Sequence, residues 1–184
     1  MKTVEPIREL KDIRNMKKYL QGRDRLLFVF GINSGLRISD ILSLRIGDVV
    51  DEFGRPRDHV ELYEEKTDKY KRFRLNDAIR TEIKRQVDGS FDDMLFKSRK
   101  GANKAISRVQ AYRIINRAAK KVGLENIRIG THSMRKTFGY HAYNNGTPLE
   151  RLQIIFNHSS PNETLGYIGI TQENIDEVYI NINL

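Results

Sequence analysis

The chain has 184 residues, 39% of them hydrophobic, and it contains no cysteine. That length predicts one domain of ordinary size with its own core. The absence of cysteine excludes disulfides, thiolate nucleophiles and cysteine-based zinc sites, and it suits a cytosolic protein. Lys and Arg number 33 against 24 acidic residues, a net charge of +9. This excess favours a polyanionic partner, nucleic acid first, although a basic surface can also serve solubility alone.

The apolar segments are too short for a membrane protein. The longest apolar run, residues 26–32, is far below the ~20 residues that a membrane span needs. The opening MKTVEPIREL has no apolar signal core. We therefore expect neither a membrane span nor a secretory signal.

The first half of the chain predicts helices followed by a small hairpin. We expect helices over residues 8–21, 25–33 and 39–44, with stops or breaks at Gly35, Gly47 and Asp48. The runs Val60–Glu64 and Phe73–Leu75 predict two strands, and the polar KTDKYK between them predicts the hairpin tip. Asn76 or Asp77 then caps a helix that ends near Val87.

The second half predicts helices with clear ends. Ser107 caps a long helix that ends near Gly123, and Thr131 caps another that Gly146 closes. The segments TPLE (147–150) and SPNE (160–163) each match a capping box with proline at the first helical position. The fold class expected is therefore α+β and helix-dominated, with a small antiparallel sheet.

Four places carry side chains that suit phosphate chemistry. His132 and Arg135 lie three residues apart in THSMRKTF, at the first turn of a helix, where free N–H groups attract anions. Arg37 stands among apolar residues in GLRISDIL, so it needs a partner, and Asp40 is a candidate. On local evidence a solvated or capping pair, or a structural ion pair, explains these residues at least as well.

The other two places are a lysine and a tyrosine. Lys66 stands at the start of the hairpin tip, where a mobile ammonium can reach a ligand, and Lys69 and Lys71 could serve instead. Tyr167 follows His158 by nine residues and lies beside two glycines that leave its phenol accessible. Lysine-rich tips that aid solubility, and a tyrosine that covers the core, are the simpler explanations of each residue alone.

Taken in order, these motifs resemble one family. GLRISD, KT on a hairpin, HSMRKTF, NHSS and GY resemble the catalytic domain of the tyrosine recombinases, the phage integrase family. That family's pattern is Arg, Lys, His-x-x-Arg, His or Trp, and Tyr. The resemblance runs from about residue 6 to the end, and the matching positions are Arg37, Lys66, His132, Arg135, His158 and Tyr167.

Two features depart from the family's usual pattern. Members usually carry an N-terminal helical domain that clamps the other face of DNA. We expect residues 1–184 to be a single catalytic domain without that N-terminal core-binding domain. FNHSS also stands where the family more often has LGHSS, and we expect this change before His158 to be tolerated.

The resemblance implies site-specific DNA recombination, such as the integration or excision of a mobile element, by transesterification. Tyr167 would attack a backbone phosphorus and form a 3′-phosphotyrosyl link with release of a 5′-hydroxyl. Arg37, Arg135 and His158 would stabilise the negative charge that develops on the phosphate oxygens.

The same resemblance assigns the proton transfers. His132 is the expected general base and Lys66 the expected acid for the leaving 5′-oxygen. Asp40 would orient Arg37 from behind. We expect no metal and no other cofactor, because Arg37 and Arg135 can neutralise the charge that Mg²⁺ neutralises in many phosphoryl-transfer enzymes.

The expected partner is double-stranded DNA, bound with a steep salt dependence. Family members act as four subunits on two duplexes, so we expect a homotetramer on DNA, a monomer in isolation, and accessory DNA-bending proteins as further candidates. The tail NIDEVYININL could dock on another protomer or pack on its own core. Candidate DNA contacts are Lys69, Lys97, Arg99, Lys100, Lys104, Arg108 and Arg113.

Three alternatives stay open at this point. Residues 147–168 would also pass for the helix-turn-helix of a catalytically inactive or accessory DNA-binding module. A metal-dependent nuclease and a type IB topoisomerase are the other two. If Tyr167 is not the nucleophile, the candidates are Tyr140, Tyr143 and Tyr179.

Overall fold

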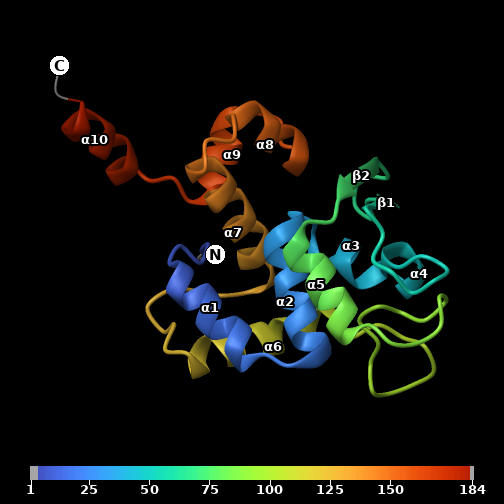
Figure 1. The fold of residues 1–184 in the computed structure, drawn as a ribbon. Helices are drawn as coiled ribbons and strands as arrows, with labels where there is room; N and C mark the ends of the chain where they lie inside the picture. Colours follow the sequence, from blue (N-terminus) through green and yellow to red (C-terminus); the bar gives the residue numbers. More distant parts are fainter. Residues whose placement is uncertain (1–3, 183–184) are drawn as a thin grey trace.

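Helices make up most of the computed structural model, which describes residues 4–182. The only sheet in this part of the chain is a two-stranded one, so the predicted α+β, helix-dominated fold class is confirmed (Figure 1). The elements are α1 (Leu10–Tyr19), α2 (Gly22–Ser34), α3 (Ile38–Ser43), α4 (Ile46–Val49), β1 (His59–Tyr63), β2 (Tyr70–Arg74), α5 (Asp77–Gln86), α6 (Arg108–Lys121), α7 (Thr131–Asn144), α8 (Leu149–Phe156), α9 (Pro161–Ile168) and α10 (Gln172–Asn181).

Helix α2 forms the centre of the main core. Its residues 26–30 are all buried, and it packs against α5 and α7. A helix that is apolar on every side has to be enclosed by its neighbours. This explains why the one strongly apolar run of the sequence lies in the middle of the molecule. Within residues 4–182 no helix is long and apolar enough to cross a membrane.

The hairpin is longer than the sequence predicted. β1 and β2 are antiparallel, with Val60 opposite Phe73 and Tyr63 opposite Tyr70. The two tyrosine rings meet edge to face at 5.7 Å, and this cross-strand pair extends β2 back to Tyr70. The turn therefore spans residues 64–69, and Lys71 belongs to a strand rather than to the predicted tip.

Side-chain caps form where three of the sequence signals placed them. Asn76, Ser107 and Ser160 each accept a hydrogen bond from the backbone N–H three residues on. Glu163 does not complete the expected box with Ser160, because its carboxylate accepts from the backbone N–H of Ser159 at 2.8 Å. The α9 helix thus begins at Pro161, as predicted.

Three other predicted helix ends were wrong. Gly47 and Asp48 do not interrupt the helical structure, because they lie in α4. There the Asp48 carboxylate accepts a hydrogen bond from the Arg45 backbone N–H at 2.7 Å. Thr131 is the first helical residue of α7, because Gly130 takes the cap position. The TPLE box does not form, since Pro148 has an extended ψ of 140° and α8 begins one residue later.

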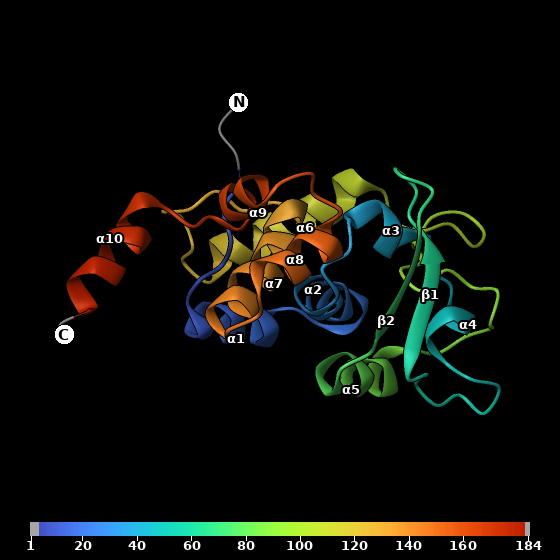
Figure 2. The same cartoon turned by 90° about the horizontal axis from the view of Figure 1, so that it is seen from above.

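The C-terminal third builds a second, smaller core. Leu152, Phe156 and Ile168 are buried between α7, α8 and α9. Beyond α9 the chain leads into α10, which projects from the body of the molecule and buries no residue (Figures 1 and 2). Of the two expectations for the tail, packing on its own core is therefore ruled out for α10.

Candidate active site

The six predicted catalytic residues come from five separate segments. The cap of α3, the hairpin turn, the first turn of α7, the α8–α9 connection and α9 supply, in that order, Arg37, Lys66, His132 with Arg135, His158 and Tyr167. Figure 2 shows α3 and the hairpin on one side of the group formed by α7, α8 and α9. The contacts below show which of these side chains meet.

Arg135 is the buried centre of the site. Only 3% of it is exposed, and its guanidinium donates to the carbonyls of Gly35 at 2.5 Å and Phe156 at 2.9 Å. The guanidinium carbon lies 4.7 Å from the centre of the Phe156 ring and 6.0 Å from that of Tyr167. These contacts fix one arginine between the ends of α2 and α8 and aim it at Tyr167.

Arg37 stands at the other side of the same space. Gly35, just before it, ends α2 with a positive φ of 63°, and the chain turns there so that Arg37 can cap α3. The Arg37 side chain is largely buried and donates to the Glu64 carboxylate at 2.8 Å. The partner that we expected, Asp40, is therefore replaced by Glu64.

Asp40 has a different task in this structure. It is fully buried, and its Oδ1 accepts a hydrogen bond from the backbone N–H of Glu65 at 3.0 Å. Its Oδ2 has no hydrogen-bond partner among the described residues. Asp40 thus anchors the start of the hairpin turn to α3 rather than orienting the arginine.

Glu64 is a buried residue of the site that the sequence did not single out. Its carboxylate also accepts from the Thr67 hydroxyl at 2.7 Å and from the Lys71 ammonium at 3.2 Å. Burial would raise the pKa of Glu64, but the Thr67 hydrogen bond and the charges of Lys71 and Arg37 together lower it to about 2. The alternation Val60, Leu62, Glu64 placed it on the inward face and could have revealed it.

Tyr167 and His158 lie against each other. Their ring centres are 5.0 Å apart, edge to face, and both pack on Phe156. The Thr164 hydroxyl lies 3.1 Å from His158 Nδ1 and orients the imidazole. Burial raises the pKa of the Tyr167 phenol, and the positive charges of Arg135 and Arg37 oppose that rise.

His132 opens the site toward solvent. Partial burial of the ring lowers the pKa of His132, and the charges of Arg135, Lys136, Arg37 and Lys66 lower it further. A neutral imidazole at pH 7 can accept a proton, which is what a general base must do.

The hairpin offers three lysines, and the structure separates them. Lys71 is largely buried and donates to the Ile155 carbonyl at 2.6 Å besides Glu64. Lys69 donates to the Asn157 side chain at 2.5 Å. Lys66 is exposed in the turn, so its ammonium is free to reach a ligand that lies over the site.

Lys136 also escaped the sequence analysis. It is 8% exposed, and its ammonium lies 5.1 Å from the centre of the Tyr167 ring. Burial lowers the pKa of Lys136, while the charge of Glu5 raises it. In the sequence, its position directly after Arg135 could have indicated that Lys136 lies near the site. It brings a further cation to the face of the tyrosine.

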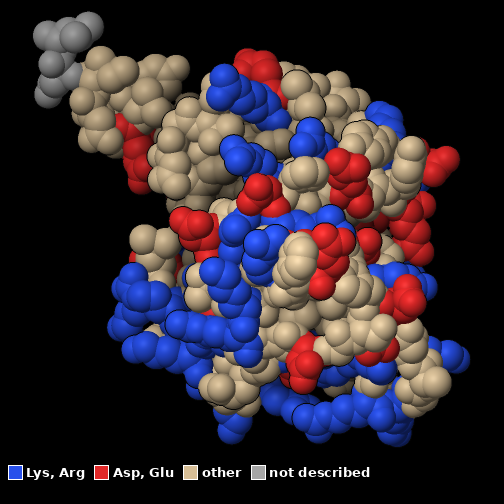
Figure 3. All heavy atoms as spheres, turned by 45° about the vertical axis from the view of Figure 1, so that its right-hand side comes forward, with Lys and Arg blue, Asp and Glu red and all other residues tan. Residues whose placement is uncertain are grey.

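The predicted DNA-contacting side chains all lie at the surface. Lys97 is paired with Asp93 at 2.8 Å, and Lys69 with Asn157 as described above. The remaining predicted contacts, on the loop before α6 and on α6 itself, are exposed: Arg99, Lys100, Lys104, Arg108 and Arg113. Figure 3 shows Lys and Arg gathered over the lower part of one face, with acidic side chains between them.

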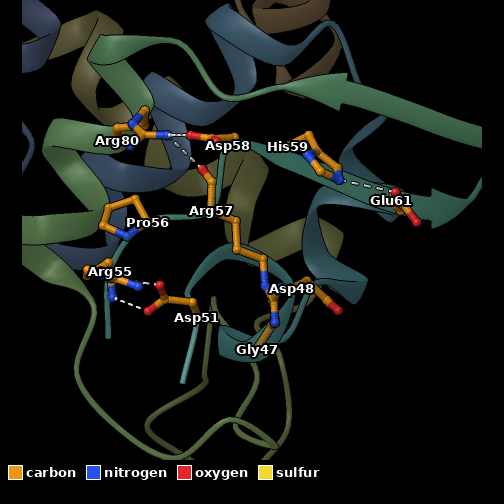
Figure 4. Close-up of a pocket in the computed structure, with 10 residues that line it drawn as sticks. All are labelled: Gly47, Asp48, Asp51, Arg55, Pro56, Arg57, Asp58, His59, Glu61 and Arg80. Carbon is orange, nitrogen blue, oxygen red and sulfur yellow. Dashed lines mark hydrogen bonds and ion pairs between the residues drawn. The ribbon is translucent and has the colours of Figure 1, made fainter. Parts of the chain in front are cut away.

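An open hollow of about 720 Å³ lies elsewhere, between α4, the loop before β1 and α5 (Figure 4). Two of its three arginines are paired with acids, Arg55 with Asp51 and Arg80 with Asp58, and Arg57 donates to the carbonyls of Gly47 and Val50. None of the six predicted catalytic residues lines it. Residues 4–182 also contain no group of three or more His, Asp or Glu side chains arranged to hold a metal ion.

The chain is similar to known proteins in both sequence and structure. A model of the phage integrase family matches residues 6–174. The chain is 45% identical over 183 residues to a probable integrase/recombinase, YoeC, of Bacillus subtilis (strain 168), covering 97% of each chain. It is 25% identical over 185 residues to the tyrosine recombinase XerA of Pyrococcus furiosus, covering 99% of this chain but 61% of that one.

Solved structures show the same fold. A crystal structure of XerA recombinase gives a TM-score of 0.75 at 18% identity, over 100% of this chain and 68% of that chain. A structure of XerH recombinase bound to a palindromic difH substrate in a post-cleavage complex gives 0.71 at 21% identity, over 97% and 54%. The chain thus spans about two thirds or less of these larger proteins.

Proposed function

The chain belongs to the phage integrase family of tyrosine recombinases, and from that premise we propose that it recombines DNA through a covalent link to Tyr167. The observation that carries the proposal is the meeting of Tyr167 with Arg135 and His158, with the charge of Arg37 acting on the same phenol. Residues 1–184 would act as one catalytic domain on double-stranded DNA, and hence in the cytoplasm beside the nucleoid.

The proposed reaction exchanges one phosphodiester for another. The Tyr167 oxygen forms a bond to phosphorus while the bond from phosphorus to the 5′-oxygen breaks. The products are a 3′-phosphotyrosyl link and a free 5′-hydroxyl. A 5′-hydroxyl from a second strand then attacks the same phosphorus and returns the tyrosine, so the bond count is conserved and no ATP is needed.

Charge on the phosphate is stabilised by fixed donors. In the transition state the non-bridging oxygens gain negative charge, which Arg37 and Arg135 would hold with guanidinium groups already aimed by Glu64 and by two carbonyls. His158 would add a third donor. Donors that are held in place before the reaction cost no reorganisation during it.

Proton transfer is divided between two side chains. Burial works against ionisation of Tyr167, so the phenol needs help, and the neutral imidazole of His132 is the proposed general base. The leaving 5′-oxygen needs a proton, and the proposed donor is Lys66 because the ammonium groups of Lys69 and Lys71 are engaged. Glu64 is the proposed support for Arg37.

The direct test is a nicked suicide duplex, from which the short 5′-hydroxyl fragment diffuses away after cleavage. The wild-type chain should form a denaturant-stable protein–DNA adduct. Tyr167→Phe should reduce adduct formation by more than about 10³-fold, since the nucleophile is lost. Tyr140→Phe, Tyr143→Phe and Tyr179→Phe are matched controls that should keep linking.

The alternative functions predict different results in this assay and in two related ones. An inactive DNA-binding module forms no adduct, and a metal-dependent nuclease loses its activity in EDTA. Joining of strands from two different duplexes separates a recombinase from a type IB topoisomerase.

Assembly is a second part of the proposal. We propose a homotetramer on DNA and a monomer in isolation, with accessory DNA-bending proteins as further partners. The support comes from α10, which projects from the body with Val178, Tyr179 and Ile180 more than half exposed. A second copy of the chain would cover this apolar face when both are bound to DNA.

A further inference from the structure

Asn157 stands where the α8–α9 connection needs an unusual backbone conformation. Its φ of 54° and ψ of 49° lie in the left-handed region, which glycine enters freely and asparagine enters more readily than most residues. Glycine is the commoner residue before the histidine in the family pattern. An asparagine here keeps the backbone path and adds a side chain that glycine lacks.

That added side chain contacts the hairpin. Asn157 Oδ1 accepts a hydrogen bond from the Lys69 ammonium at 2.5 Å. Both residues are exposed, so the bond lies at the rim of the site rather than in the core. It joins two segments that are 88 residues apart in the sequence.

The hairpin turn is otherwise held at its base and, within the turn, by the Thr67 hydroxyl, which donates to the Glu64 carboxylate at 2.7 Å. Asp40 binds the backbone N–H of Glu65, and Lys71 binds the Ile155 carbonyl. Across the turn the Glu64 N–H donates to the Lys69 carbonyl at 3.0 Å, which closes the loop that contains Lys66. Fixing the side chain of Lys69 therefore fixes the far side of the loop that presents Lys66.

We propose that Asn157 is a positioning residue that holds the hairpin turn through Lys69 and so sets where Lys66 meets the leaving 5′-oxygen. This inference rests on the proposed function, in which Lys66 is the acid. Asn157 itself touches no reacting atom. Asn157 would affect the reaction only through the position of the Lys66 ammonium group.

The step that tests the proposal is proton delivery to the leaving group. When the bond from phosphorus to the 5′-oxygen breaks, the electron pair stays on oxygen and the proton of Lys66 neutralises it. A 5′-bridging phosphorothiolate replaces that oxygen by sulfur. Its thiolate, with a thiol pKa of ~8.5 in the cysteine reference, leaves without a proton, so cleavage no longer needs the acid.

The variants are Asn157→Gly, which keeps the left-handed backbone and removes the acceptor, and Lys69→Met, which removes the donor. Each should slow adduct formation on the oxygen substrate by about fivefold, the size expected for losing one exposed hydrogen bond of typical net strength. On the sulfur substrate, with DNA at saturation, Asn157→Gly should react at the wild-type rate. The double variant should be no slower than either single one.

Lys66→Ala is the reference, with a larger loss on oxygen and the same rescue on sulfur. Equal slowing of Asn157→Gly on both substrates would place the defect at the phosphate or at His158 and overturn the proposal. An unchanged rate on oxygen would overturn it too. So would weaker DNA binding in Lys69→Met with no effect of Asn157→Gly, because Lys69 would then serve as a DNA contact.

Failure of the proposed function would look different. In that case the wild-type chain would form no adduct on either substrate, or Tyr167→Phe would still form one. The role of the hydrogen bond between Asn157 and Lys69 is tested only if the wild-type chain forms the adduct. Failure of the proposed function therefore appears in the wild type and in Tyr167→Phe, whereas failure of the Asn157 proposal appears in Asn157→Gly and Lys69→Met.

Discussion

Single residues decide how the charges of this site are held. Glu64 is the clearest case, because one buried carboxylate receives hydrogen bonds from Arg37, Thr67 and Lys71. A buried carboxylate is tolerated only when its charge is paired in this way. Glu64 therefore both stabilises the hairpin base and keeps the guanidinium of Arg37 in one position.

Replacing Glu64 tests this at the residue scale. Its folded-state pKa of about 2 lies below its ordinary value of 4.5, so its contribution is present above pH 4.5 and is lost as the pH falls toward 2. In the wild type the free energy of unfolding should fall by about 3 kcal/mol more over this window than in Glu64→Gln. Urea unfolding at several pH values measures this difference.

The control for that series is Glu61→Gln. Glu61 lies three residues earlier, in β1, but is half exposed, and its ion pair with Arg72 is a surface pair, worth little. Glu61→Gln should keep the wild-type dependence on pH. If Glu64→Gln also keeps the wild-type dependence on pH, the ion pairs of Glu64 do not contribute to the free energy of unfolding.

At the scale of elements, α7 is the helix on which the two cores meet. It packs against α2 on one side and against α9 on the other. Close approach on both sides depends on glycine. A Cβ at Gly31 of α2 would lie 2.6 Å from the Met134 sulfur, and a Cβ at Gly139 of α7 would lie 2.6 Å from both Ile168 and Phe156.

Alanine at these two glycines should have unequal effects. Gly139→Ala should lower the free energy of unfolding by about 2–3 kcal/mol, because its neighbours are a buried aromatic ring and a β-branched side chain that cannot move aside. Gly31→Ala should cost less, since the flexible Met134 can adopt another rotamer. Urea unfolding of both variants checks the order, and equal losses would contradict it.

The Gly139 variant should also affect the chemistry. Ile168 follows Tyr167 directly, so pushing α9 away from α7 moves the phenol relative to Arg135. Adduct formation by the folded fraction should therefore fall in Gly139→Ala more than in Gly31→Ala.

For the whole molecule, α10 is the part that does not belong to either core. None of its residues is buried, although Val178, Tyr179 and Ile180 are apolar or aromatic and more than half exposed. Apolar side chains gathered on one projecting helix are usually covered by a partner. The two cores of one protomer are thus complete without α10, whereas the proposed assembly of several protomers on DNA would use this helix.

A chain that ends at Thr171 tests this division. Its free energy of unfolding should stay within about 0.5 kcal/mol of the full chain, since no buried contact is lost. Leu152→Ala, a core change that should cost about 2–5 kcal/mol, shows that the measurement can detect a real loss. Multi-protomer complexes on a DNA with two sites, resolved by native electrophoresis, should be lost in the shortened chain.

The sequence by itself determined the family of the protein, and it predicted the list of reacting groups. Local patterns were enough for the caps at Asn76, Ser107 and Ser160, because a cap is made by residues three apart. They were also enough for the order of the six motifs. They failed at Pro148, and at Gly47, whose backbone N–H donates to the Phe91 carbonyl at 3.0 Å, a contact that no local pattern reveals.

Only the tertiary structure decided which side chains work together. Arg37 binds Glu64 rather than Asp40, and Asn157 binds Lys69, across separations of 27 and 88 residues. No local spacing encodes such pairs, because they depend on how the hairpin packs against α3, α8 and α9. The chemistry could therefore be predicted from residue types, whereas the positions of the charges follow from the packing of the whole chain.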